Sequence, residues 1–269
     1  MLTESQSIGT GTSLGRSFAI QSRVLHALMM RELVSRFGRE NLGLLWLVGE
    51  PMLFTLGVTT LWTLAGLHSG STIPIVAFAV TGYSSVLMWR NSAGRCTSAI
   101  QQNKQLLFHR NVRILDVLIT RTVLEIGGAT SSFIVLSAVF IYTGSMPAPE
   151  DPLKVIGGWL MLAWFGSSLA IAIGAGVAFS ELVDRIWHPA AYLLFPLSGA
   201  AFMVEWLPKR FQEAVLLLPM VHGTELIREG WFGAVVQTHH DMGYMAACCL
   251  VQTLIALYLQ RQASLRLEF

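Results

Sequence analysis

Gln101-Gln-Asn-Lys-Gln-Leu-Leu-Phe-His-Arg-Asn-Val-Arg-Ile-Leu-Asp116 separates two long apolar runs of the chain. Its flanks are polar and cationic, whereas Leu106, Leu107 and Phe108 form an apolar knob at its centre. Positive residues concentrate in the cytoplasmic connections of multispan membrane proteins. A short surface helix with one apolar knob is also suited to insertion into a groove on another protein. The stretch therefore predicts either an ordinary cytoplasmic loop or a docking element.

The composition indicates an integral membrane protein. The chain has 269 residues, of which 53% are hydrophobic and 13% are charged, and its mean hydropathy is +0.56. Soluble domains carry about 25% charged residues. The net charge of +2 is nearly neutral and says little about partners. We expect no nucleic-acid partner. Cys96, Cys248 and Cys249 have neither disulfide nor zinc spacing, and we interpret them as small apolar residues.

Six apolar runs predict an all-α membrane protein with six transmembrane helices, because about 20 helical residues cross a hydrocarbon core of about 30 Å. Basic residues gather before the first run, between the second and third, between the fourth and fifth, and after the sixth. This asymmetry predicts that both termini are cytoplasmic. The predicted spans lie near residues 42–66, 73–93, 115–142, 154–180, 186–204 and 242–260.

The N-terminal part predicts two further segments. Residues 1–16 are rich in Gly, Ser and Thr, which is typical of disorder. Residues 17–40 predict an amphipathic helix, which either lies along the cytoplasmic membrane face or packs on protein. Residues 41–269 would then form the transmembrane domain. The helix carries apolar residues on one face and basic or histidine residues on the other, namely Ile20, Val24, Leu25 and Leu28 against Arg16, Arg23 and His26.

Charge inside a predicted span is costly, and the ionisable residues of the first and third spans include Glu50, Arg121 and Glu125. Glu50 precedes Pro51 in the first span, so its carboxylate needs a partner or water. Arg121 and Glu125 stand four residues apart near the start of the third span, where each can neutralise the other. We interpret this spacing as a structural pair, with a functional role as the alternative.

The segment from Glu205 to Asp241 is too polar to cross the bilayer and too apolar for a free loop. Pro208 and Pro219 divide it into two helical fragments. Re-entrant half-helices in the outer leaflet, placed before the last span, fit this pattern, and an interfacial cap without a transport role is the alternative. Its polar residues predict either an outer gate or a satisfied ion-pair cluster, and they are His222, Glu225, Arg228 and Glu229.

Several kinds of chemistry are absent from the sequence. The chain has no Gly-Lys dipeptide, which excludes a phosphate-binding P-loop. His239-His240-Asp241 lacks a helical pair of ligands four residues apart, so we predict a polar loop and no metal site. No Ser/His/Asp constellation suggests itself either. The chain is therefore not predicted to be an enzyme, and any chemistry must come from a partner.

Four stretches together resemble the membrane permease of ABC-2 type polysaccharide exporters, and most closely the inner-membrane subunit of Gram-negative group 2 capsule exporters. They are Arg31-Glu32-Leu33 with Arg36-Phe37-Gly38, Leu42-Gly43-Leu44-Leu45-Trp46 running to Glu50-Pro51, Asn103 through Asp116, and Leu218-Pro219-Met220-Val221-His222 with Glu225-Leu226 and Arg228-Glu229. The chain departs from the family pattern at Leu218, where those permeases carry Asn, and at Asn111, where they carry Pro.

The resemblance implies a homodimer bound to two copies of a cytoplasmic ABC ATPase. ATP and Mg would bind to the ATPase, and this chain would bind no cofactor. The helix after the second span would dock into the ATPase through Asn103, Leu106, Leu107, Phe108, Arg110, Arg113 and Asp116. The helix before the first span would form a gate at the cytoplasmic mouth with Arg31, Glu32, Arg36 and Arg39. These arginines either receive acidic groups of the substrate or only set the topology.

The implied substrate is an anionic, lipid-linked capsular polysaccharide, moved from cytoplasm to periplasm across the bacterial inner membrane. A periplasmic polysaccharide co-polymerase and an outer-membrane exporter would be further partners. Tryptophans at span ends are either membrane-interface anchors or surfaces for sugar stacking. The expected substrate path contains Trp46, Glu50, Trp62, Trp159 and Trp164.

Two alternatives to capsule export fit the sequence. The first is an ABC-2 permease for O-antigen, teichoic acid or a small drug. The second, from another class, is a membrane-embedded lipid-modifying enzyme that has no ATPase partner.

Overall fold

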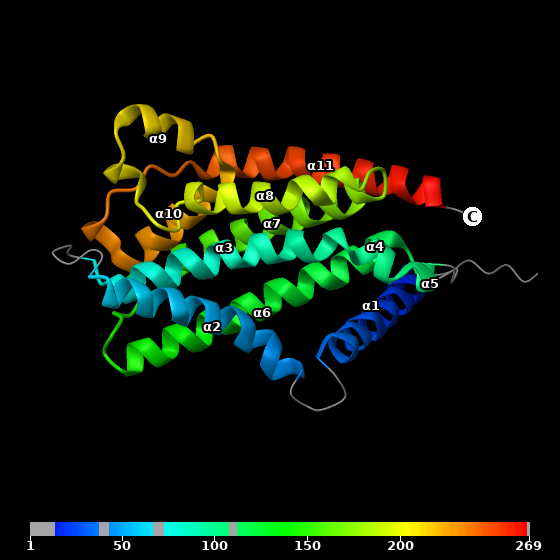
Figure 1. Ribbon diagram of the computed structural model, residues 1–269, viewed down its shortest axis with the longest axis horizontal. Coiled ribbons are helices and arrows are strands. Elements are labelled where there is room, and N and C mark those ends of the chain that lie inside the picture. Colours follow the sequence, from blue (N-terminus) through cyan, green and yellow to red (C-terminus); the bar gives the residue numbers. More distant parts are fainter. Residues whose placement is uncertain (1–13, 38–42, 67–72, 108–111, 268–269) are drawn as a thin grey trace, which may run out of the picture.

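The protein is a bundle of long helices that run roughly parallel to its longest dimension (Figure 1). The computed structural model describes residues 14–37, 43–66, 73–107 and 112–267. Within these ranges the secondary structure is helical and contains no strand, which confirms the predicted all-α class. Phe108, Arg110 and Arg39 lie outside the described residues, as do residues 1–13 of the predicted disordered N-terminus.

Each predicted span corresponds to one helix. The helices are α1 Leu14–Phe37, α2 Gly43–Leu64, α3 Ile75–Thr97, α4 Ala99–Gln102, α5 Lys104–Leu107, α6 Ile114–Tyr142, α7 Pro152–Val177, α8 Leu182–Leu197, α9 Lys209–Val215, α10 Pro219–Phe232 and α11 Met242–Leu267, with 3-10 turns η1 Val204–Trp206 and η2 Gly233–Val235. The helix α8 ends before the predicted boundary at residue 204, because Gly199 adopts a left-handed turn with φ +80°.

Among the described residues, four helices are long and apolar enough to cross a bilayer. These are the segments Leu45–Leu64, Ile114–Tyr142, Pro152–Val177 and Met242–Arg266. The other two predicted spans correspond to α3 and α8. The helix α3 carries Arg90 and Arg95, and α8 has only 16 residues, a length of about 24 Å.

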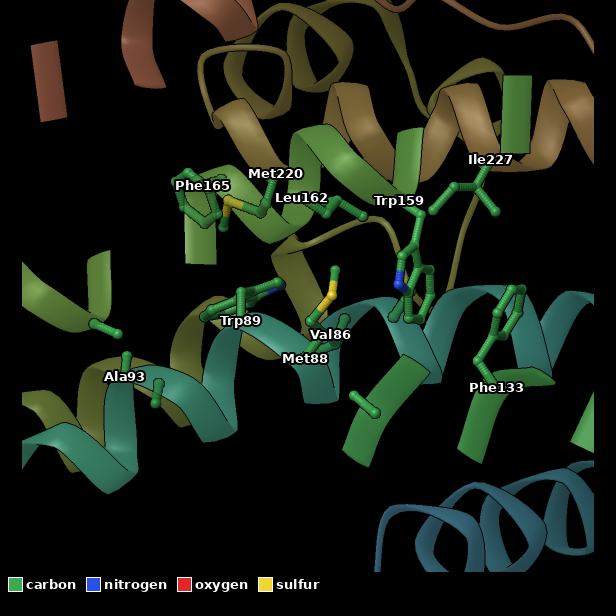
Figure 2. Close-up of a cluster of buried hydrophobic side chains, with 14 of the residues drawn as sticks. Val86, Met88, Trp89, Ala93, Phe133, Trp159, Leu162, Phe165, Met220 and Ile227 are labelled. Atoms are coloured by element: carbon green, nitrogen blue, oxygen red, sulfur yellow. The ribbon is translucent and has the colours of Figure 1, made fainter. Parts of the chain in front are cut away.

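The core lies where α7 meets α3, α10 and α11. Figure 2 shows large apolar side chains of α3, α6, α7 and α10 that point toward one another in this region. The indole of Trp159 stacks on the ring of Phe133 with centroids 4.4 Å apart, and Trp89 meets Phe165 edge-on at 6.1 Å. Close packing of this kind holds membrane helices together, because lipid is as apolar as the side chains and gives no hydrophobic driving force between them.

The N-terminal helix α1 packs on α6 and α2. Leu28 is buried and Val24 is half-buried, whereas Arg23 and His26 are exposed. Leu25 is half-buried but Ile20 is 37% exposed, so α1 packs on protein through only part of its predicted apolar face.

The bundle has two distinct ends. Figure 1 shows α1, α4, α5 and the C-terminal end of α11 at one end, and α9 with α10 at the other. The proline-divided segment after α8 forms the helical fragments that the sequence predicts, with Pro208 just before α9 and Pro219 as the first residue of α10. Two sets of predicted site residues are therefore separated by the length of the bundle.

A close approach between α2 and α6 gives the first testable prediction. A Cβ at Gly128 would lie 2.8 Å from the backbone oxygen of Leu47, whereas one at Gly127 would meet nothing within 4 Å. Gly128→Ala is expected to lower stability by about 1–3 kcal/mol relative to Gly127→Ala, because backbone cannot move aside as a side chain can. Both variants replace glycine by alanine within α6, so the gain in helix propensity is the same and cancels when their stabilities are compared. Thermal unfolding of the two purified variants measures the difference, and equal midpoints would contradict this contact.

Candidate functional site

A polar junction, defined here as Arg31, Glu32, Asn103 and Arg121, joins α1 to the turn after α4 and to α6. Arg31 donates a hydrogen bond from Nη1 to Oδ1 of Asn103 at 2.7 Å. Arg121 forms an ion pair from Nε to Oε1 of Glu32 at 2.9 Å. Gln21 of α1 also donates to the carboxylate of Asp116 at the start of α6. The N-terminal helix is thus fixed to α6 at two positions along its length, through Glu32 and through Gln21.

Arg121 is the centre of the junction. Its side chain is only 4% exposed. Besides the ion pair, it donates to the backbone oxygen of Arg95 at 2.8 Å, to Oγ of Ser98 at 3.2 Å and to the side-chain oxygen of Gln102. These acceptors lie at the end of α3 and on α4, so one guanidinium connects α1, α6 and the turn between α3 and α4.

A second ionic chain crosses from α2 to α6. Arg95 of α3 donates to both carboxylate oxygens of Glu50, at 3.0 and 3.1 Å, and lies 3.6 Å from the carboxylate of Glu125. Arg121 and Glu125, predicted to neutralise each other along one helix, therefore each have a partner on another helix. The carboxylate of Glu50 has the partner that its position inside a span requires.

The junction encloses polar space. A cavity of about 300 Å³ is lined by its residues together with Ser35, Arg95, Ser98 and Gln102. A cavity of this size with polar walls has room for water, which weakens the ion pairs at its rim.

The predicted docking residues divide by burial. Asn103 and Asp116 are each 3% exposed and have internal roles. The amide of Asn103 donates to the oxygen of Ala99 at 2.9 Å, and Asp116 accepts from the backbone N–H of Arg113 at 2.9 Å, which caps α6. Leu106 and Leu107 are half-buried and Arg113 is exposed. Of the predicted gate residues, Arg36 belongs to α1, but its side chain is outside the described part of the structure.

At the opposite end, Arg228 of α10 is completely buried. Its guanidinium donates to the backbone oxygens of Gly199, Ala200 and Phe202, at 2.5 to 2.6 Å, and lies 3.8 Å from the ring centroid of Phe78. Burial lowers the pKa of Arg228 to about 9, which leaves the group charged at neutral pH. Arg228 therefore fixes the turn after α8 against α3.

The neighbours of Arg228 are also held by local contacts. Glu225 is 1% exposed and accepts from the backbone N–H groups of Val204 and His239 at 3.3 and 3.2 Å. Burial raises its pKa. Glu229 pairs with Lys154 at 2.8 Å, and hydrogen bonds from Lys154 and Thr238 lower its pKa. These contacts support the structural alternative for this cluster, while an outer gate stays a prediction.

His222 connects α10 to the start of α11. Its Nε2 lies 2.8 Å from the oxygen of Leu216, and its Nδ1 accepts from the backbone N–H of Asp241 at 2.8 Å. This pair of partners requires a neutral ring with the proton on Nε2. Burial lowers the pKa of His222, which favours the same neutral form.

Two further histidines precede α11. His239 lies 2.5 Å from the carboxylate of Glu205, and His240 lies 3.1 Å from that of Glu229.

The tryptophans predicted to line a path occupy different environments. Trp46 is 53% exposed, and Trp62 contacts the rings of Phe78 and Tyr83. The indole N–H groups of Trp159 and Trp164 donate to hydroxyl groups, on Thr130 at 2.9 Å and Thr253 at 3.0 Å. The last two are integrated into the packing of a single chain, and a role for any of the four in a path stays a prediction.

Two central residues escaped prediction as site residues. Arg95 is one of the basic residues between the second and third predicted spans, and the sequence predicts Arg121 only as a local partner of Glu125. The signal for both is their charge at the edge of an apolar run, which requires compensation. Their partners Glu50 and Glu32 lie far away in sequence, so the pairing is visible only in the folded chain.

Comparison with known proteins gives consistent results. Residues 23–232 match the family model described as ABC-2 type transporter. The chain is 44% identical over 247 residues to the capsule polysaccharide export inner-membrane protein CtrC of Neisseria meningitidis serogroup B, covering 91% of this chain and 93% of that protein. It is 38% identical over 260 residues to the capsule polysaccharide export inner-membrane protein BexB of Haemophilus influenzae, covering 97% and 98%. The polysialic acid transport protein KpsM of Escherichia coli is 27% identical over 251 residues, covering 91% and 95%.

Proposed function

Because this chain belongs to the ABC-2 type transporter family, we propose that it works as a homodimer driven by two copies of a separate cytoplasmic ATPase. The chain is an inner-membrane permease for capsular polysaccharide export. The observation that carries this conclusion is the similarity to capsule export proteins over more than nine tenths of the chain. It favours the capsule exporter over the O-antigen, teichoic acid or drug permease and over the lipid-modifying enzyme.

The partners follow from what the chain lacks. A permease without a P-loop needs an ATPase subunit that binds ATP and Mg, while the permease itself binds no cofactor. Its substrate is a lipid-linked anionic polysaccharide, which passes on to a periplasmic co-polymerase and an outer-membrane exporter. The names of the relatives refer to capsule polysaccharide export, which supports the polysaccharide as substrate.

The proposed topology has six spans, with α3 and α8 as the second and fifth. Both helices lie beside α7, which is itself apolar enough to cross the bilayer. In this arrangement α1, α4, α5 and both termini are cytoplasmic, and α9 and α10 form re-entrant helices on the periplasmic side. The positions of these elements at opposite ends of the bundle support the proposal (Figure 1).

Force enters through residues 101–116. The ATPase pushes on this segment when it closes around ATP, and the polar junction makes α1 move together with α4 and α6. The gate at the cytoplasmic mouth therefore changes position with the docking segment. ATP binding and hydrolysis select between two arrangements of this unit, since a ligand shifts an equilibrium only through different affinity for its two states.

Polymer passes between protomers along α2 and α8. Aromatic and weakly polar walls suit a sliding chain, because tight recognition of every sugar would stop transport. Trp46 and Glu50 on α2 are exposed in the single chain, a position that supports contact with the substrate or the second protomer.

Phe108→Asp tests the docking segment. A charge in the apolar knob is expected to reduce co-purification of the ATPase at least tenfold while the permease still folds, because the knob would have to desolvate a carboxylate on docking. Val235→Asp is the matched control, since Val235 is a 57% exposed apolar residue on η2 at the other end of the bundle. Pull-down and ATP hydrolysis measure the effect. A Phe108→Asp complex that is intact and stimulated by ATP would remove the docking role.

A further inference from the structure

A second cavity lies between α2, α3 and α8 and shares Arg95 with the cavity at the polar junction. Its volume is about 370 Å³, within the range of about 300–1,000 Å³ typical of small-molecule sites. Charged and aromatic side chains share its wall, among them Arg90, Arg95, Trp187 and Tyr192. Arg95 stands two residues before the end of α3, so the cavity belongs to the half of the bundle that leads to α4.

The charges on the wall do not cancel. Arg95 is engaged by Glu50 through both carboxylate oxygens, and His188 lies 3.6 Å from the carboxylate of Asp184 on its own helix. Arg90 has no carboxylate partner and makes no hydrogen bond within the described residues. Its guanidinium lies 4.7 Å from the ring centroid of Tyr192 and 5.9 Å from that of Phe195. One positive charge of the wall is therefore uncompensated.

An uncompensated arginine on a helix between two spanning helices is costly unless it faces water or a ligand. Cation–π contact with the rings of Tyr192 and Phe195 holds the guanidinium of Arg90 in place without pairing its N–H groups with an oxygen acceptor. A planar fork of donors fixed in this way suits a carboxylate or a phosphate, which accept two parallel hydrogen bonds.

The same wall offers surfaces for a sugar ring. Trp187 is 6% exposed, lines the cavity, and makes no hydrogen bond within the described part of the chain. Its Nε1 would lie 3.6 Å from a Cβ at Gly94, an ordinary van der Waals distance, so the indole edge lies close to α3. Phe54 and Tyr192 add aromatic faces from α2 and α8. Aromatic faces beside a positive charge fit an acidic carbohydrate better than a neutral one.

We propose that this cavity is a binding site for the anionic groups of the exported glycan, with Arg90 as the residue that receives a carboxylate or phosphate and Trp187 and Tyr192 as contacts for the attached sugar. The proposal rests on the function proposed above. It names the unit of substrate that the permease recognises and places this recognition on the wall of α3 and α8, away from the arginines of α1.

Binding of small probes tests the site directly. The permease and its ATPase are reconstituted together in phosphatidylcholine nanodiscs, and saturation-transfer NMR follows a galacturonic acid tetramer, glucose 1-phosphate and maltotetraose. The wild-type complex is expected to bind both acidic probes and not maltotetraose. Arg90→Gln is expected to weaken binding of both acidic probes at least tenfold, and Arg90→Lys to weaken it less, because the charge remains while the fork is lost.

Matched variants separate the site from general effects of charge. Arg266 also lies over an aromatic ring, 5.7 Å from the centroid of Phe179, but outside this cavity, and Arg266→Gln is expected to bind the acidic probes as wild type. Tyr192 is 67% exposed, so Tyr192→Ala is expected to fold even where Arg90→Gln does not. It should weaken binding of the tetramer at least threefold.

Three results would overturn the inference. Unchanged affinity of the acidic probes in Arg90→Gln or Tyr192→Ala would show that the cavity is not their site. Equal binding of maltotetraose would remove the role of charge. Displacement of the probes by phosphatidylglycerol in the nanodisc would assign the site to membrane lipid. In each case the proposed function stands if the wild-type protein exports capsule and co-purifies with the ATPase. A wild-type protein that does neither would contradict the proposed function instead.

Discussion

Arg228→Leu is expected to abolish accumulation of folded permease in the membrane. The guanidinium is fully buried and donates to three backbone oxygens of the turn after α8. Leucine leaves these oxygens without donors, and each buried unsatisfied acceptor costs about 1–3 kcal/mol. The sum is comparable to the whole stability of a typical domain, about 5–15 kcal/mol. Contact with the ring of Phe78 is lost as well.

Detergent-extracted protein on size-exclusion chromatography measures this effect, with capsule staining of cells as a second readout. Arg228→Lys is expected to be intermediate, because one ammonium group cannot reproduce the guanidinium fork. The exposed Arg210 of α9 provides the control, and Arg210→Leu should leave the yield unchanged. A folded, monodisperse Arg228→Leu protein would show that the turn is held by other contacts.

Arg121→Gln is expected to reduce capsule export at least tenfold without preventing membrane insertion. Glutamine removes the ion pair with Glu32 and most of the donors to the turn between α3 and α4. Breaking a buried ion pair costs about 3–5 kcal/mol. The polar cavity beside the junction reduces this loss, so we expect about 1–3 kcal/mol of stability and a larger effect on the coupled movement of α1.

A double-mutant cycle of Arg121→Gln, Glu32→Gln and the double variant measures the interaction between these two residues. If the two residues act together, the double variant exports about as well as Arg121→Gln alone, because the interaction has already been lost. Rates of surface capsule appearance and ATPase activity are measured in parallel. ATP hydrolysis that continues while export fails would indicate lost transmission, whereas independent, additive losses would contradict a shared role.

The sequence predicts the helices well, because long apolar runs and prolines act locally. The start of α6 at Ile114 and the fragments on either side of Pro219 follow from such signals. The end of α8 does not, because its apolar run continues to residue 204 while the turn at Gly199 is held by Arg228 from a distant helix.

The candidate site is less accessible to sequence reasoning, because its energy lies in pairs that are far apart along the chain. The position of Glu50 within a span shows that its charge needs a partner, but no residue near it in the sequence indicates that this partner is Arg95. Arg121 has a carboxylate four residues away, so local reasoning stops at Glu125 and does not reach Glu32. The family resemblance implies a gate role for α1 and a docking role for residues 101–116, which stay predictions, while the hydrogen bond that connects α1 to Asn103 is visible only in the structure.

The polar junction limits how parts of related permeases can be exchanged. Each contact that holds α1 in place joins a side chain of α1 to one from the turn after α4 or from α6. A chimaera that imports only the first forty residues of a relative would bring one half of each charge pair into a host that keeps the other half. A functional transplant must therefore carry the segment through Arg121 along with the N-terminal helix.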